Sequence, residues 1–438
     1  MKLTRYIVFV DINNDKKIMI NSLNGKVDTV NFFAYKTLLK WQKCDKITTT
    51  SDAERLLYST LESRGYLVKS SEDEITIKKS VLDALNQRHF EKKKQSTYMT
   101  FIVTYDCNFR CNYCFEGGSH AKKEIISPVL IDAALALAGD GLKGIGLFGG
   151  EPLLPNAKPS LEYLVSKRPE ASYDITTNGF YLAEYADFLS SINVSGITVT
   201  LDGEEEAHNN RRRLADGSPT YKQIINGIQE CLDRGIKIRV RMVSDFSNFN
   251  ECNSLQDKLL SSFSKHNDLL SFEITTNMGL SEKDRNHLIS EIYRLDLENT
   301  GGKKRPLAAM SPIIHAISSG IPARPVYSYC YAHENNLMVD PYGNLFTCLA
   351  SIGKNEYSVG KYYPEVEFYE NSIFNRNVGN IPECEECKYS LLCGGGCPLR
   401  LKDHKNIFKP SCTSIKGQIH DLLPQIYNIR QSTIGSVK

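Results

Sequence analysis

The sequence TFIVTYDCNFRCNYC, residues 100–114, joins a short apolar run to three closely spaced cysteines. Residues 100–104 have the β-branched and aromatic composition of a buried strand, and the cysteines follow it directly. Three thiolates on one loop can hold three irons of a 4Fe-4S cube and leave the fourth iron open to a ligand. The structural alternatives are a zinc site completed by a distant ligand, or three buried thiols.

Similar apolar runs recur five more times along the chain, with helix-like stretches between them. Strands that alternate with helices predict a parallel α/β sheet, either an open wound sheet or a partial barrel. In such folds the chemistry gathers at the carboxyl edge of the strands. The six predicted strands are residues 100–104, 144–148, 173–176, 197–201, 236–243 and 270–275.

Glycine-rich or polar motifs follow the second, third and fourth predicted strands. Paired glycines let the backbone approach a ligand, and a carboxylate beside them can accept from an ammonium group, although a tight turn is the alternative. An arginine can pair with a carboxylate, although surface arginine is the alternative there. The motifs are Phe148-Gly149-Gly150-Glu151-Pro152, Thr176-Thr177-Asn178-Gly179, Thr200-Leu201-Asp202 and Arg211-Arg212-Arg213.

The Cys-x3-Cys-x2-Cys spacing, with an aromatic residue before the last cysteine, resembles the radical S-adenosylmethionine (SAM) superfamily, and the later motifs extend the resemblance. The resemblance implies a 4Fe-4S cluster on Cys107, Cys111 and Cys114, whose open iron binds SAM for reductive cleavage to a 5′-deoxyadenosyl radical. It also implies cofactor contacts, namely Tyr113 near the adenine; Gly149, Gly150 and Glu151 for the methionine amino group; Thr177 and Asn178 at the same edge; Thr200 for the ribose; and Arg212 for the carboxylate.

Seven more cysteines fall within residues 330–412, after the strand–helix alternation has ended. Their spacing predicts a small metal-stapled domain, with zinc ribbons as the alternative. Together with Gly343 and Gly394-Gly395-Gly396, the pattern resembles the SPASM extension of peptide-modifying radical enzymes. That resemblance implies two auxiliary 4Fe-4S clusters, a distal one on Cys384, Cys387, Cys393 and Cys412 and a nearer one on Cys330, Cys348 and Cys397.

The nearer cluster is one ligand short on this count. An open iron there can bind a substrate thiolate and accept an electron as a sulfur–carbon bond forms, which favours thioether formation. The alternatives are solvent or a fourth ligand from this chain, such as a histidine, a carboxylate or one of the lone cysteines Cys44, Cys231 and Cys252. Leu349 stands where anaerobic sulfatase-maturing relatives have an aspartate, which counts against that particular reaction.

The first eighty or so residues have short apolar runs, an Asn24-Gly25 hairpin signal, helix-like stretches at 35–42 and 52–63, and closing segments at 65–68 and 74–77. The polar segment 87–96 indicates a linker. The pattern resembles the winged-helix domain with which peptide-maturing radical enzymes bind a leader peptide as an extra strand. A structural cap on the barrel is the alternative.

Composition bounds the class of protein. With 438 residues, 41% hydrophobic and a net charge of +2, the chain is globular and lacks the basic surface expected of a nucleic-acid or membrane-surface binder. The run after Met1 is too short for a signal peptide, and no other run would span a membrane, so we expect a cytoplasmic protein.

The expected fold class is α/β, a partial (β/α)6 TIM-like barrel with an N-terminal winged-helix-like α+β module and a C-terminal iron–sulfur SPASM/twitch domain. The expected domains are a peptide recognition domain at 1–90, a radical SAM barrel at 97–305, and a bridging segment with the SPASM domain at 306–438.

The sequence therefore predicts an oxidoreductase-type enzyme with three 4Fe-4S clusters and SAM, which crosslinks side chains of a ribosomally made peptide through a thioether bond. Carbon–carbon crosslinking or another radical modification is the alternative. A zinc-stabilised, non-catalytic peptide-binding protein is the alternative from a different class. The expected partners are a precursor peptide with a leader sequence and an electron donor such as flavodoxin or ferredoxin, with no nucleic acid and no membrane.

Overall fold

The structure is a computed structural model that describes all residues except 95–96, 120, 299–321, 334–335, 402–405 and 436–438. The expected boundary at 305–306 between the second and third domains lies outside the described residues. Among the residues that are described, no helix is both long enough and apolar enough to cross a bilayer.

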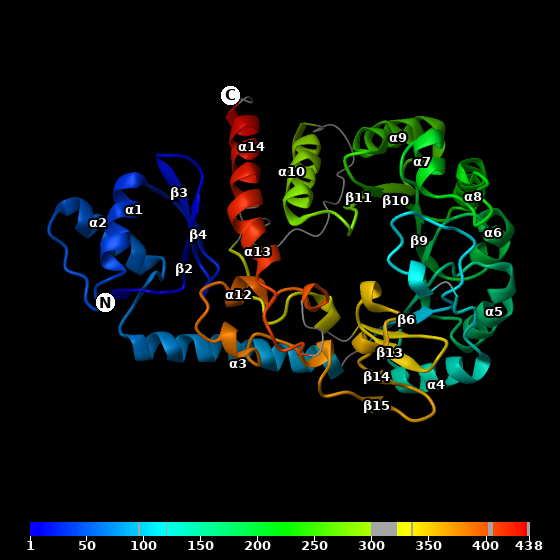
Figure 1. Ribbon diagram of the computed structural model, residues 1–438, viewed down its shortest axis with the longest axis horizontal. Coiled ribbons are helices and arrows are strands. Elements are labelled where there is room, and N and C mark those ends of the chain that lie inside the picture. The colour runs from blue at the N-terminus through cyan, green and yellow to red at the C-terminus, as the bar shows by residue number, and fades with distance from the viewer. Residues whose placement is uncertain (95–96, 120, 299–321, 334–335, 402–405, 436–438) are drawn as a thin grey trace.

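Six parallel strands form the greater part of a ten-stranded sheet (Figure 1). Their order in the sheet follows their order in the chain, as expected when a helix connects each strand to the next. All six strands predicted from the sequence are present, which confirms the α/β class. Their bounds are β6 Tyr98–Ile102, β7 Gly144–Phe148, β8 Ser172–Thr177, β9 Val194–Thr200, β10 Ile238–Ser244 and β11 Leu270–Thr276.

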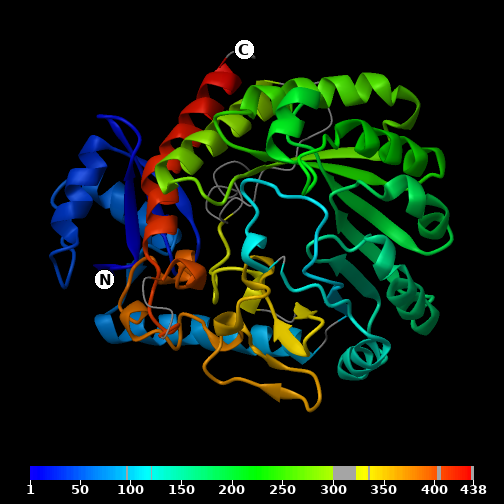
Figure 2. The ribbon, with the colours of Figure 1, turned by 45° about the vertical axis from the view of Figure 1, so that its right-hand side comes forward.

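Helices cover the outer face of this curved sheet, and the inner face stays open as a partial barrel (Figure 2). Strand β10 illustrates the difference between the two faces, because its side chains alternate between them. Val240 and Met242 are fully buried in the main core, whereas Arg241 and Val243 line an interior pocket. The helices that follow the strands are α4 Pro128–Ala138, α5 Lys158–Lys167, α6 Leu182–Ser190, α7 Glu205–Arg211, α8 Tyr221–Asp233, α9 Phe249–Ser262 and α10 Glu282–Glu298.

The N-terminal module is a three-stranded antiparallel sheet with two helices packed against it (Figure 1). The predicted Asn24-Gly25 turn lies between the second and third of these strands, and Gly25 has a φ of +72° that favours glycine. A second small sheet pairs the chain start with residues 67–68. The elements are β1 Lys2–Leu3, β2 Ile7–Asp11, β3 Lys16–Asn21, β4 Val27–Asn31, α1 Phe32–Trp41, α2 Asp52–Ser63 and β5 Leu67–Val68.

The predictions of a linker at 87–96 and of a separate closing segment at 74–77 are wrong, because residues 71–94 form one long helix, α3 (Ser71–Lys94). Residues 95–96 of the predicted linker lie outside the described residues. The Ser70 hydroxyl accepts from the amide of Asp73, as an N-cap residue does, and no glycine or proline interrupts the residues that follow. Val81, Leu82 and Leu85 pack one face of the helix against the C-terminal domain. Polar composition therefore marked a solvated helix face rather than a linker.

The C-terminal part extends the barrel sheet and then returns to the N-terminal module. Strand β12 pairs in parallel with β6, and β13 to β15 continue the sheet as antiparallel strands. The last helix packs beside α10 and against the buried face of β2 and β3. The elements are β12 Leu337–Val339, β13 Asn344–Phe346, β14 Gly360–Lys361, β15 Glu367–Phe368, α12 Ser390–Cys393, α13 Thr413–Gly417, a π-helical turn at Gln418–Leu422 and α14 Leu423–Gly435.

Candidate active site

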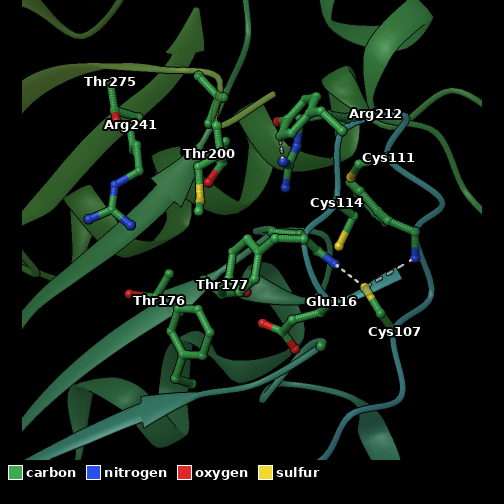
Figure 3. Close-up of a pocket in the computed structure, with 18 of the residues that line it drawn as sticks. Cys107, Cys111, Cys114, Glu116, Thr176, Thr177, Thr200, Arg212, Arg241 and Thr275 are labelled. Carbon is green, nitrogen blue, oxygen red and sulfur yellow. Dashed lines mark hydrogen bonds between the residues drawn. The ribbon is translucent and has the colours of Figure 1, made fainter. Parts of the chain in front are cut away.

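A pocket of about 390 Å³ lies at the carboxyl edge of the barrel strands. Cys107, Cys111 and Cys114 all line it, so the loop after β6 brings the three predicted cluster ligands to one place (Figure 3). The opposite wall comes from β10 and β11. This arrangement leaves space beside the three thiols for a ligand of the size of a nucleoside.

Backbone and side-chain donors surround the first thiol. The Cys107 Sγ accepts from the amide of Phe109 at 3.4 Å and from the Asn178 Nδ2 at 3.8 Å (Figure 3). Burial raises the pKa of the Cys107 and Cys111 thiols, and raises the pKa of Cys114 to about 11. Thiols in such surroundings ionise when a cation binds them, and N–H donors then stabilise the thiolate.

The glycine pair after β7 holds the cysteine loop by close backbone contact. A Cβ on Gly149 would lie 2.2 Å from the carbonyl oxygen of Thr104, and one on Gly150 would lie 2.3 Å from that of Asp106. Gly149 also has a φ of +140°. Only glycine fits both positions, because any side chain would push the loop that carries Cys107 out of place.

We expect Gly150→Ala to lower the free energy of unfolding by about 1–3 kcal/mol through overpacking. It should also weaken SAM binding, because the displaced loop carries the first cysteine. Chemical denaturation and equilibrium dialysis with SAM measure the two effects. Gly196→Ala in β9 is the matched control, since its new Cβ would meet nothing nearer than 3.8 Å. Equal stability of the two variants would contradict the proposed contact.

Glu151 lies behind the pocket wall and is fully buried. Its carboxylate accepts from the Thr177 hydroxyl at 2.6 Å, from the Asn178 amide at 2.7 Å and from the Leu153 amide at 2.9 Å. These bonds tie the ends of β7 and β8 together. Its predicted contact with the methionine amino group stays a prediction.

The three neighbouring arginines have different surroundings. Arg211 pairs with Asp245 at 2.9 Å, and Arg213 is exposed. Arg212 alone of the three lines the pocket, where its Nη1 donates to the Tyr113 hydroxyl at 2.7 Å and its Nε has no hydrogen-bond partner among the described residues. The Tyr113 hydroxyl in turn donates to Asp202. Arg212 is thus the arginine whose position suits the predicted carboxylate contact.

The remaining predicted cofactor residues also reach the pocket. Thr200 ends β9, while Thr177 and Asn178 end β8, and all three line the pocket. Thr177 and Asn178 also donate hydrogen bonds to Glu151, so some of their hydrogen-bonding groups are already occupied. Of the eight cofactor residues predicted from the sequence, only Glu151 lies outside the pocket lining.

Three charged residues that no sequence motif identified line the same pocket, Glu116, Arg241 and Glu273. Glu116 is 4% exposed, its Oε2 lacks a partner among the described residues, and burial raises its pKa to about 8. Arg241 pairs with Glu273 at 3.2 Å on adjacent strands. The barrel periodicity could have identified the last two, because both fall between buried residues of their strands.

A second, much smaller pocket of about 20 Å³ lies in the C-terminal domain. Burial raises the pKa of Cys384 to about 11 and that of Cys393 to about 12. The four cysteines that the sequence assigned to the distal cluster all line this pocket, namely Cys384, Cys387, Cys393 and Cys412. Four thiols around one small space fit a fully ligated 4Fe-4S cube.

The three cysteines assigned to the nearer cluster are also close to one another. Burial, together with the nearby charges of Cys348 and Cys397, raises the pKa of Cys330 to about 11. The lone cysteines lie elsewhere, with Cys231 and Cys252 in the barrel core. Within the part of the chain that the structure describes, no three Cys, His, Asp or Glu side chains are arranged to hold a single metal ion.

The glycine triplet between Cys393 and Cys397 forms a tight turn. Gly394, Gly395 and Gly396 have φ values of +62°, +83° and +75°. A Cβ on Gly396 would lie 1.8 Å from the carbonyl oxygen of Ser411, the residue before Cys412. The triplet therefore lets the two loops that carry the distal cysteines approach each other.

Residues 101–248 match the sequence model of the radical SAM superfamily, so this part of the chain is a radical SAM domain. Such a domain implies a 4Fe-4S cluster and SAM. The pocket fits them, because three thiols, a glycine cradle and two buried charged groups without full partners meet there. Cys107, Cys111 and Cys114 could hold the cluster, and Arg212 and Glu116 face the space beside it.

Two curated relatives each match about a third of the chain. The chain is 30% identical over 149 residues to the probable GTP 3′,8-cyclase of Archaeoglobus fulgidus and 33% identical over 161 residues to the GTP 3′,8-cyclase of Nautilia profundicola. The matches cover 34% and 35% of this chain and 49% and 48% of those proteins. The chain thus spans about half the length of the curated relatives that it matches.

Two solved structures share the fold over more of the chain. SuiB of Streptococcus suis, bound to precursor peptide SuiA, has a TM-score of 0.56 at 14% identity and covers 94% of this chain and 99% of its own. The anSMEcpe protein, with bound AdoMet and the Kp18Cys peptide, has a TM-score of 0.56 at 16% identity and covers 78% and 98%. At these identities the likeness concerns the fold alone.

Proposed function

We propose that this protein is a radical SAM enzyme that crosslinks side chains of a ribosomally made peptide by a thioether bond. One observation carries the proposal: three cysteines share an open pocket at the barrel edge, while seven more form two sets in the adjoining domain. The first set supplies radical chemistry, and the second supplies electron acceptors. Carbon–carbon crosslinking is the alternative, and it would use the same cysteines.

The proposed reaction needs two kinds of site, one that forms a radical and one that accepts an electron. The cluster that Cys107, Cys111 and Cys114 would hold, together with SAM, would supply radical chemistry that can remove one hydrogen atom from a substrate carbon. A sulfur–carbon bond then forms as the substrate thiol loses its proton and one electron leaves the peptide. We assign that electron to the cluster that Cys330, Cys348 and Cys397 would hold. A flavodoxin or ferredoxin would supply the electron that starts the next turnover.

The pocket also has a polar wall suited to a peptide. Thr200, Arg241 and Glu273 lie in register on three adjacent parallel strands, so their side chains form one row on the inner face. Arg241 and Glu273 are each about a quarter exposed, with side chains 29% and 26% accessible. These groups can exchange hydrogen bonds with substrate polar atoms, and Val243 and Met278 add apolar contact.

The two structures with peptides bound support a peptide as the class of substrate. SuiB shares its fold with this chain over 94% of the chain, a share too large to leave out the whole N-terminal module. The matches to GTP 3′,8-cyclases cover between 34% and 46% of this chain, less than the solved structures do, so they support SAM chemistry and not a particular substrate. A peptide substrate agrees better with the extent of the shared fold. We place the protein in the cytoplasm, where thiols stay reduced.

We propose that the N-terminal module binds a leader peptide at strand β4. This strand is an edge of its sheet, and Phe33, just beyond its end, is 56% exposed. An added strand would use the main-chain groups of β4, while Phe33 would contact an apolar side chain of the leader. The effective concentration of the core peptide at the barrel would then rise.

Replacing Phe33 with aspartate should weaken leader-peptide binding at least about tenfold, because a charge replaces an apolar contact. Fluorescence anisotropy with a labelled leader measures the affinity. SAM cleavage without peptide should stay unchanged. Leu56→Asp is the matched control, because Leu56 is a 70% exposed apolar residue on α2. An equal loss of affinity in both variants would contradict a site beside β4.

Mass spectrometry tests the proposed reaction. A cysteine-containing peptide encoded beside this chain should lose two hydrogens on turnover. A thioether consumes the cysteine thiol, so the product should resist iodoacetamide, whereas a carbon–carbon crosslink leaves the thiol reactive. An unchanged peptide mass under conditions that cleave SAM would contradict peptide crosslinking.

A further inference from the structure

Arg376 is a fully buried arginine in the centre of the cysteine-rich domain, just beyond the short helical turn Ile373–Asn375. A guanidinium stays charged in proteins, and a buried one needs both hydrogen bonds and an opposite charge nearby. Main-chain groups around Arg376 provide the hydrogen bonds. Cysteines, rather than a carboxylate, are the candidates for the opposite charge.

Among the described residues, the guanidinium donates to main-chain carbonyl oxygens alone. Its Nη2 reaches Gly395 at 2.6 Å and Lys409 at 2.8 Å, its Nη1 reaches Gly396 at 2.7 Å, and its Nε reaches Ile407 at 2.6 Å. The two glycines lie between Cys393 and Cys397, and residues 407–409 lie shortly before Cys412. One side chain thus ties together the loops that carry ligands of both auxiliary clusters.

No carboxylate pairs with this charge among the residues that the structure describes. Burial lowers the pKa of Arg376, and the groups that oppose this effect are four thiols, Cys384, Cys393, Cys397 and Cys330. Two of them belong to the distal set and two to the nearer set. The guanidinium also binds the carbonyl oxygens of Gly395 and Gly396, which lie between Cys393 of the distal set and Cys397 of the nearer set, so it lies beside both sets. The thiolates of these cysteines, once they hold iron, would be its counter-charges.

We propose that Arg376 is a positioning residue whose fixed positive charge is shared by the two auxiliary clusters and makes both easier to reduce. This inference rests on the proposed presence of those clusters. A cation in a poorly hydrated interior favours the more negative, reduced state of a nearby cluster. That effect would suit clusters that take up an electron from the substrate.

A second buried cation gives an internal comparison. Lys78 of α3 is 6% exposed and donates through its Nζ to the carbonyl oxygens of Cys384, at 3.2 Å, and Glu385. Burial lowers its pKa, which the charges of Cys387 and Cys384 oppose. Both cysteines belong to the distal set. Lys78 should therefore act on the distal cluster alone, whereas Arg376 should act on both.

The test is a redox titration of the full chain after anaerobic reconstitution, followed by electron paramagnetic resonance. The catalytic cluster is identified by its spectral change on SAM addition and serves as the internal reference. At the wild-type midpoint, Arg376→Gln should lower the reduced-to-oxidised ratio of both auxiliary clusters about tenfold, a shift of about 59 mV for one electron. Arg376→Lys keeps the charge and should stay near wild type. Lys78→Met should shift the distal cluster only.

Arg400→Gln is the matched control, because Arg400 is a part-exposed arginine three residues beyond Cys397. It should leave both ratios unchanged. Wild-type ratios in an Arg376→Gln protein that keeps all its iron would overturn the charge role. If Arg376→Gln loses auxiliary iron, the iron content of Arg376→Lys decides between the charge and the hydrogen bonds. Iron retained in Arg376→Lys supports the charge role. An equal loss of iron in both variants means that the hydrogen bonds alone matter, and it overturns the proposal.

Iron content of the wild-type protein separates this inference from the proposed function. About twelve irons per chain, with no shift in Arg376→Gln, would overturn the role of Arg376 alone. About four irons per chain would overturn the auxiliary clusters and this inference with them, while radical chemistry at the barrel would stand.

Discussion

Replacing Cys107 with alanine should abolish the formation of 5′-deoxyadenosine from SAM under reducing conditions. The thiol lies in the pocket wall and already accepts two N–H donors, so it is placed to bind one iron of the cube. With one of three ligands lost, the cluster with the open iron should not persist. We expect iron to fall from about twelve to about eight per chain, and nucleoside formation to fall at least about a thousandfold.

Cys231→Ala is the control for this variant. Cys231 is fully buried in α8 and belongs to the apolar core of the barrel, so its removal should cost some stability but no iron. Liquid chromatography of the nucleoside and colorimetric iron analysis are the two measurements. Continued SAM cleavage by Cys107→Ala would show that the three cysteines do not form the catalytic site.

Replacing Cys348 with alanine should separate radical formation from crosslinking. Cys348 belongs to the nearer set, which we propose accepts the electron released as the sulfur–carbon bond forms. Formation of 5′-deoxyadenosine should persist at half the wild-type rate or more, while crosslinked peptide should fall at least about a hundredfold. Quantifying both products in one reaction gives the ratio directly.

Cys44→Ala is the matched control for the second prediction, because Cys44 lies in the N-terminal module, just beyond α1. It should change neither product. Crosslinking that continues at the wild-type rate in Cys348→Ala would contradict an electron-accepting role for the nearer set. Loss of both products together would instead show that the auxiliary domain is required for SAM cleavage itself.

The barrel could be predicted from the sequence because its strands are short apolar runs separated by helices, a pattern set by burial on both faces. Helix α3 could not be predicted, because its polar composition resembles that of a linker. One face of the helix is buried only where it packs on the C-terminal domain. Local sequence does not encode that partner, because Lys78 and Cys384 are 306 residues apart.

The candidate site was predicted best where a motif is compact. The cysteine spacings placed three thiols in one pocket and four in another, as the structure has them. Isolated charged residues such as Glu116 and Arg376 carry no spacing signal. Their importance depends on burial and on partners that come from distant segments, so only the three-dimensional structure draws attention to them.

The similarity to two GTP 3′,8-cyclases covers only about a third of this chain, and the superfamily match covers the segment 101–248, which carries the cluster loop and part of the barrel. That segment would bind SAM whatever the substrate, so its similarity identifies the cofactor chemistry rather than the substrate. The pocket wall that we propose contacts the peptide includes Glu273 and Met278, which lie beyond residue 248, where the superfamily match ends. Substrate choice is therefore expected to depend on residues outside the matched domain.

We expect the three thiols of the barrel loop to leave one iron open for SAM. Anaerobic reconstitution, reduction with dithionite and addition of SAM test this expectation. We predict that 5′-deoxyadenosine and methionine form in equal amounts. A protein that holds its full complement of iron and yet yields neither product would contradict the account.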